Sequence, residues 1–115
     1  MKKFGQSLAR VIERSRILKQ VYKKDVHFGD LVIVNTHNST YSVRVLSHGR
    51  YLVSGGWFDL HGLSPVKTSI TGCTWGGSVI KLDILAACGL CLEFGNRVVT
   101  SPIQKVTVIK YTEQN

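Results

Sequence analysis

The first two dozen residues repeat apolar positions at the spacing of a helix. Between residues 4 and 22, apolar or small side chains recur every three or four positions, which places them on one face of an α-helix. Ile17 falls outside this stripe, where a partner or a second copy of the chain can contact it. The pattern predicts an amphipathic helix over residues 4–22. The stripe consists of Phe4, Leu8, Val11, Ser15, Leu18 and Tyr22, with Ile12 at its edge.

After residue 26 the pattern changes to short strands separated by turn residues. Tyr41, Val43 and Val45 alternate with polar side chains, as in an antiparallel strand that buries one face. The continuous apolar run over residues 31–34 predicts a central strand covered on both faces. We expect residues 83–89 to form one capped helical turn. The predicted strands are residues 31–36, 40–46, 50–58, 66–71, 78–82, 90–94, 97–101 and 104–109.

This order of elements predicts a mainly β fold, α+β by element count. We expect a small antiparallel barrel of SH3-like or sandwich type, preceded by the amphipathic basic helix. Residues 29–34, followed by a polar hairpin, resemble the opening strand of SH3-like barrels, and residues 100–103 are similar to the turn before their last strand. Such a resemblance implies a fold and no activity. The expected parts are a basic amphipathic helix or arm (1–25), a small β-barrel domain (26–110) and a C-terminal tail (111–115).

Positive charge is concentrated in the predicted helix. The formal net charge is +8. Residues 1–24 contain eight basic side chains and one acidic side chain, whereas residues 25–115 contain seven basic and six acidic ones. A helix with this imbalance forgoes nearly all ion pairs between its turns and attracts a polyanion. The predicted nucleic-acid or anion contacts are Arg10, Arg14, Arg16, Lys19, Lys23 and Lys24.

Two clusters of tryptophan and glycine are the most unusual feature of the chain. Residues 54–59 and 72–77 contain both tryptophans and five of the 11 glycines. Exposed aromatic rings beside positive charge suit base stacking, which makes Trp57 and Trp75 candidate nucleic-acid contacts. We favour the alternative that Trp57, Phe58 and Trp75 fill the core while the glycines form bulges around them. Exposure of both rings on one face would distinguish ligand binding from packing.

The three cysteines offer a weaker candidate site. Cys88 and Cys91 form a CxxC motif, and Cys73 lies upstream. Zinc requires four ligands, so a histidine (His27, His37, His48 or His61) would have to complete the set. The motif follows the predicted helical turn, whereas a redox CxxC begins a helix. We therefore predict partly buried thiols and no metal, and keep a zinc-bound regulator as an alternative.

No group of residues resembles a matched acid, base and nucleophile. Asp59 and His61 stand two positions apart, but Gly62 and Pro65 follow closely, which favours a turn-forming aspartate beside a solvated histidine. His37 and His48 fall at predicted hairpin tips, where we expect them to be exposed. The sequence contains no phosphate-binding glycine loop, nucleophile elbow or carboxylate cluster. We expect neither an enzyme nor a bound cofactor.

Together these patterns predict a non-enzymatic binding module that contacts nucleic acid or another polyanion, such as an acidic protein surface, through a basic helix. One alternative is a protein-interaction or assembly subunit that forms homo-oligomers without a nucleic-acid ligand, and the other is the zinc-bound regulator. We expect a cytoplasmic location, because charged residues interrupt any apolar secretory signal. A mitochondrial transit peptide over residues 1–24 is the weaker alternative. No membrane span is predicted, because no apolar run reaches roughly 18 residues.

Overall fold

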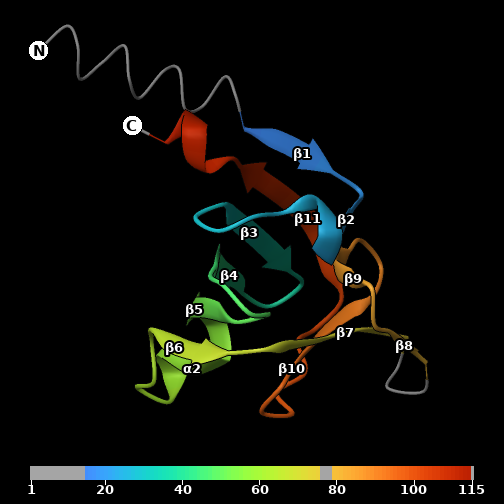
Figure 1. Ribbon diagram of the computed structural model, residues 1–115. Coiled ribbons are helices and arrows are strands. Elements are labelled where there is room, and N and C mark those ends of the chain that lie inside the picture. The colour runs from blue at the N-terminus through green and yellow to red at the C-terminus, as the bar shows by residue number, and fades with distance from the viewer. Residues whose placement is uncertain (1–14, 76–78, 115) are drawn as a thin grey trace, which may run out of the picture.

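The computed structural model describes residues 15–75 and 79–114, and it shows a mainly β protein (Figure 1). Its strands are β1 (Arg16–Leu18), β2 (Gln20–Tyr22), β3 (Leu31–Thr36), β4 (Thr40–Val45), β5 (Tyr51–Gly55), β6 (Val66–Thr68), β7 (Ile70–Thr74), β8 (Ile80–Lys81), β9 (Ile84–Ala87), β10 (Cys91–Phe94) and β11 (Ile103–Ile109). The short helices are η1 (Lys23–Asp25), α2 (Gly56–Leu60) and η2 (Tyr111–Glu113). No helix in the two described ranges has the length and apolar character needed to cross a membrane.

The strands pair antiparallel in three sheets. The largest sheet has the order β1-β11-β3-β4-β5-β6, a second has the order β10-β7-β8, and β2 pairs with β9. β1 and β6 stand at opposite edges of the large sheet and do not pair with each other. The sheets therefore stay open. The predicted mainly β class is confirmed, and the prediction of a closed barrel is wrong.

The alternating pattern identifies the centre of the large sheet correctly. β3 has the predicted bounds, and β4 ends one residue earlier than predicted. Val32 and Val34 are fully buried and lie opposite Val43 and Tyr41 of β4. The intervening side chains of β3 are half-buried. Because side chains alternate between faces, the apolar run is thus covered fully on one face and partly on the other.

The predicted N-terminal helix is wrong over residues 16–22, while residues 4–14 of the prediction lie outside the described ranges. Residues 16–22 form β1 and β2 instead. β1 lies beside β11 and β2 lies beside β9 (Figure 1). In these pairs, Ile17 is opposite Thr107 and Val21 is opposite Ala86. β-branched residues favour strands, and unpaired backbone groups at a strand edge provide hydrogen-bond partners. Pairing with two distant strands therefore overrides the helical spacing.

Other predicted boundaries also change. Residues 83–89 contain strand β9, whose four side chains are buried, in place of a helical turn. A short buried apolar run does not by itself distinguish a helix from a strand. The strand predicted over residues 50–58 ends at Gly55, where φ is 104°, and α2 follows. The strand over 66–71 divides into β6 and β7, and residues 97–101 contribute only the bridge between Val99 and Glu93.

An aromatic cluster joins the two larger sheets. Phe58 of α2 packs edge-to-face against Phe94 of β10, with ring centroids 5.0 Å apart, and against Tyr41 of β4 at 6.1 Å. Tyr41 also contacts Phe94 directly at 5.6 Å. Phe58 and Phe94 are fully buried. Aromatic pairs of this geometry stabilise a core beyond their burial alone, so α2 connects the large sheet to the three-stranded one.

A candidate anion-binding groove

The structure does not place the predicted cationic residues on one helix face. Arg16 lies on edge strand β1, and Lys19 connects β1 to β2. The Lys23 ammonium turns inward and donates hydrogen bonds to the carbonyl oxygens of Ile70 (2.7 Å) and Thr71 (3.3 Å). Burial lowers the pKa of Lys23, against the opposite effects of Cys73 and Asp83. Arg10 and Arg14 lie outside the described residues.

A different cationic surface surrounds the turn between β4 and β5. Two hollows of about 420 and 400 Å³ adjoin there and share Phe28, Leu46 and Ser47 in their linings. We call them together the cationic groove. Among the described residues, no acidic side chain lines either hollow. The basic and imidazole side chains that line the groove are Lys23, Lys24, His27, His48, Arg50 and Lys67.

The β4–β5 turn positions one rim of the groove. His48 and Gly49 both have positive φ, at 59° and 71°. Leu46 N–H donates to the Arg50 carbonyl (2.9 Å), and Arg50 N–H donates to the Ser47 carbonyl (3.3 Å). Two central residues with positive φ define the tight hairpin turn whose twist matches the flanking strands. His48 and Arg50 are therefore held on a short, well-defined hairpin.

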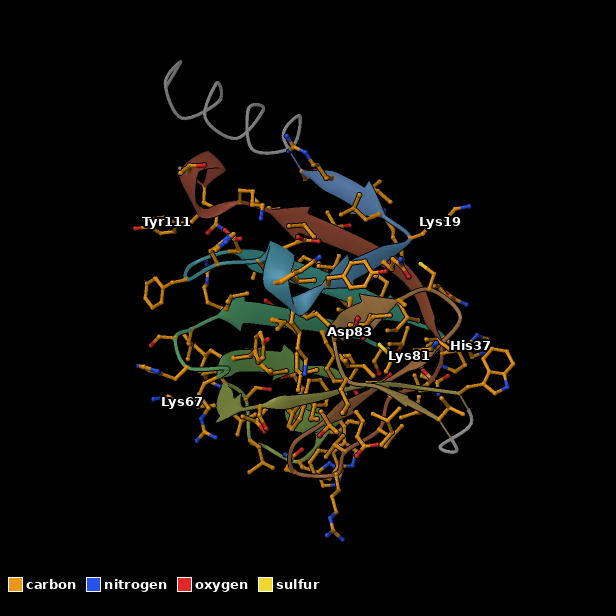
Figure 2. The ribbon with its side chains drawn as sticks, turned by 45° about the vertical axis from the view of Figure 1, so that its right-hand side comes forward. Lys19, His37, Lys67, Lys81, Asp83 and Tyr111 are labelled. Atoms are coloured by element: carbon orange, nitrogen blue, oxygen red, sulfur yellow. The ribbon has the colours of Figure 1, made fainter. Side chains whose placement is uncertain are left out.

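Strand β6 brings a further cation to the same groove. Lys67 lies opposite Leu52 in the pairing of β5 with β6, and its side chain is exposed. Figure 2 shows Lys67 and Tyr111 on one side of the molecule, with Lys19 and His37 on the opposite side. Lys24, Arg50 and Lys67 form no ion pair with any described residue. Their charges are thus available to an anionic ligand.

A buried carboxylate fixes the loop that carries Phe28. Asp30 accepts hydrogen bonds from the backbone N–H groups of His27 and Tyr111, both at 2.9 Å, and from the Lys110 ammonium at 3.1 Å. Burial acts to raise the pKa of Asp30, but these hydrogen bonds and the Lys110 charge hold it below its ordinary value. Three donors on one carboxylate tie the loop to the C-terminal segment.

The residue between Phe28 and Asp30 is fixed as well. Gly29 N–H donates to the Val45 carbonyl (2.8 Å), and the Gly29 carbonyl accepts from Arg44 (3.0 Å) and Gln114 (3.1 Å). Gly29 has φ of 91°, and a Cβ there would lie 2.6 Å from the Tyr111 ring. Glycine is required by both the backbone conformation and the close approach of that ring.

Two exposed aromatic rings result from this arrangement. Phe28 is 65% exposed and Tyr111 is 60% exposed. The Tyr111 ring lies over Gly29, the residue that follows Phe28, and Phe28 itself lines both hollows of the groove. Phe28 thus presents an exposed aromatic ring at a surface lined by cations, a combination that suits base stacking. None of Phe28, Tyr111, Arg50 and Lys67 is among the contacts predicted from the sequence. The signal for this site in the sequence is a phenylalanine beside a glycine in a loop.

The two tryptophans are more exposed than predicted. Trp57 is 37% exposed and Trp75 is 65% exposed, so the favoured prediction that both fill the core is wrong, and Phe58 alone of that group is buried. Trp57 stacks on His61 with ring centroids 3.9 Å apart. It lines a separate hollow of about 220 Å³ together with Tyr41 and Ser101. Neither tryptophan lines the cationic groove, so the rings and cations that the sequence paired are not brought together there.

The cysteines do not gather into a metal site within the described residues. Cys73 is buried, Cys91 is half-buried and Cys88 is exposed. Burial raises the pKa of the Cys73 thiol to about 11, which disfavours the thiolate that a metal needs. No group of three or more His, Cys, Asp or Glu side chains able to hold a metal is found in residues 15–75 and 79–114. The geometry of this part of the chain therefore lends no support to the zinc alternative.

The histidines behave as turn and surface residues. Asp59 accepts a hydrogen bond from Gly55 N–H (3.1 Å), and His61 Nδ1 lies 2.8 Å from the Trp57 carbonyl oxygen. The Asp59 carboxylate thus stabilises the turn into α2, in agreement with the favoured interpretation. His37 and His48 are exposed, as predicted.

The groove has the chemistry of an anion site. Guanidinium and ammonium groups bind phosphate or carboxylate oxygens through charge-assisted hydrogen bonds. A third hollow beside it, lined by Tyr22, Lys23, Lys24 and Asp83, carries an acidic side chain and is less suited to anions. No protein-family model matches the chain, and no curated protein or solved structure matches it significantly.

Proposed function

We propose that this protein is a non-enzymatic module that binds nucleic acid through the cationic groove. One observation carries the proposal: two adjoining hollows share an exposed phenylalanine and are lined by cations with no acidic side chain among the described residues. This replaces the predicted helix as the site of contact. It keeps the predicted class of partner, because a polyanion complements a groove whose charges all have one sign.

The charge around the groove supports an extended anion over a single small one. Lys24 lies at one end, with its ammonium 5.8 Å from the centre of the Tyr22 ring, while Arg50 and Lys67 line the other hollow. A phosphodiester chain presents one charge per nucleotide and reaches both hollows at once. With three phosphate contacts, we expect the logarithm of the association constant to fall with the logarithm of the salt concentration at a slope of about −2 to −3.

Removing the groove cations is expected to weaken nucleic-acid binding. We expect Arg50→Ala and Lys67→Ala each to reduce affinity for a labelled oligonucleotide about fivefold at low salt, and to lower the salt slope by about one. Fluorescence anisotropy over about 50–200 mM salt measures both quantities. Lys105→Ala is the matched control, because Lys105 is an exposed cation on β11 outside the groove.

The Lys105→Ala control distinguishes binding at the groove from a general effect of net charge. An equal loss in Lys105→Ala would show that net charge, and not the groove, attracts the oligonucleotide. Absence of binding by the unaltered protein at low salt would overturn the proposed function.

A second candidate function is self-assembly through the β7–β8 hairpin. β8 stands at the edge of its sheet. Four apolar side chains on and beside it are exposed: Trp75 (65%), Val79 (53%), Ile80 (43%) and Leu82 (63%). An unpaired edge with exposed apolar residues is a template for pairing with another chain.

Light scattering tests this second candidate. If the hairpin assembles, we expect the protein to form a dimer or larger species that Leu82→Lys dissociates. Leu60→Lys is the control, since Leu60 is 84% exposed on α2, away from the hairpin. A monomer at concentrations of about 100 μM, where even weak specific pairs associate, would remove this candidate.

A further inference from the structure

We infer that the cationic groove binds unpaired nucleotides, with a base stacked on Phe28 and the adjoining phosphates held by Arg50 and Lys67. This inference rests on the proposed function and adds the class of ligand.

Phe28 lines both hollows, so its side chain is within reach of a ligand in either one. The ring is 65% exposed, while its neighbours in the lining include Arg50 and Lys67. Duplexes keep their base faces stacked inside the helix, whereas single strands offer base faces together with phosphates. An aromatic ring among cations therefore matches a single strand.

The backbone on both sides of Phe28 is fixed by hydrogen bonds before any ligand arrives. Phe28 is flanked by His27 and Gly29, whose backbone groups are bonded to Asp30 and Val45. Tyr111, over Gly29, is tied to the same carboxylate. A preorganised loop loses little conformational freedom on binding, so more of the stacking energy appears as affinity.

The size of the hollows also suits a nucleotide. Each hollow has a volume of about 400 Å³, at the lower end of the range that accommodates a small organic ligand. A single nucleotide fits such a space, whereas the width of a duplex does not. Apolar Val45 and Leu46 are part of the lining, which suits the face of a base.

The test compares three oligonucleotides of about 12 nucleotides, a length within the usual range for small single-strand binding domains. They are an unstructured single strand, the same phosphodiester chain without bases, and a duplex. Anionic lipid vesicles serve as a fourth ligand, a polyanion that is not a nucleic acid. We expect the single strand to bind about tenfold more tightly than the duplex or the abasic chain at equal salt. Phe28→Leu keeps an apolar side chain of similar size and removes the aromatic face. It is expected to lower single-strand affinity about tenfold and to leave duplex and abasic affinities within about twofold.

Trp57→Leu is the matched control, because it removes an exposed ring outside the groove. Phe28 is largely exposed, so its replacement is not expected to unfold the protein, and circular dichroism checks this. Equal affinity for single strand, duplex and abasic chain, with no effect of Phe28→Leu, would overturn this inference and leave the proposed function intact. Failure of every oligonucleotide to bind, with or without binding to vesicles, would overturn both.

Discussion

Phe58→Ala is expected to lower the free energy of unfolding by about 3–5 kcal/mol. The Phe58 side chain is fully buried and packs edge-to-face against Tyr41, Phe94 and Trp57. Truncation to alanine removes these contacts and leaves a cavity between the sheets that only partly collapses. Domains of this size are stable by about 5–15 kcal/mol, so the loss is a large part of the total. Urea denaturation followed by circular dichroism measures it.

Leu60→Ala is the control for that experiment. Leu60 belongs to the same helix, α2, but is 84% exposed. Its truncation is expected to change stability by less than about 0.5 kcal/mol. If both variants lost the same small amount, α2 would not connect the two larger sheets, and the aromatic cluster would not be the centre of the core.

Asp30→Asn is expected to lower the free energy of unfolding by about 2–4 kcal/mol at neutral pH. The carboxylate accepts from His27 N–H, Tyr111 N–H and the Lys110 ammonium. An amide of the same size has one acceptor oxygen and directs its own NH₂ group at these donors. The Lys110 charge also loses its ion-pair partner, at 3.1 Å. Urea denaturation of both proteins at neutral pH measures the difference.

The same carboxylate predicts how stability depends on pH. Because the pKa of Asp30 is lower in the folded protein than in the unfolded chain, its ionised form stabilises the fold at all pH values above the unfolded value of about 3.9. That stabilisation is lost as the pH falls through the lower, folded value. The stability difference between the unaltered protein and Asp30→Asn should therefore stay constant from pH 7 to about 5 and shrink below about 4.

Asp25→Asn serves as the control in this pH series. Asp25 is an exposed carboxylate in η1, a few residues before the same loop. Its replacement is expected to change the free energy of unfolding by less than about 0.5 kcal/mol. A constant difference for Asp30→Asn down to pH 2 would contradict the role assigned to the carboxylate. The loop that presents Phe28 would then depend on the backbone bonds of Gly29.

Local patterns determined the centre of the large sheet. Along β3 and β4, alternate apolar positions specify one buried face, and β-branched residues fit the pleated backbone. The turn over Ser47-His48-Gly49 was equally local, because tight hairpins need residues that accept positive φ. Features of this kind are decided by residues within a few positions of one another, so sequence reasoning locates them well.

Tertiary contacts decided the secondary structure of residues 16–22. The spacing that predicts a helix through Leu18 and Tyr22 depends on side chains alone. It contains no information about strand edges elsewhere in the fold with which this segment can pair. Val21 is buried by pairing with β9, more than 60 residues later in the chain. Such a partner has no signature near residues 16–22, and its hydrogen bonds outweigh a weak local preference.

The candidate site belongs almost entirely to the tertiary structure. The chain itself determined that the protein is basic, because net charge is a sum over residues and needs no geometry. It did not show that Phe28, Arg50 and Lys67 meet, since three separate connections, the loop before β3, the β4–β5 hairpin and strand β6, bring them together. Charge is additive along a sequence, whereas a groove exists only after distant segments have packed.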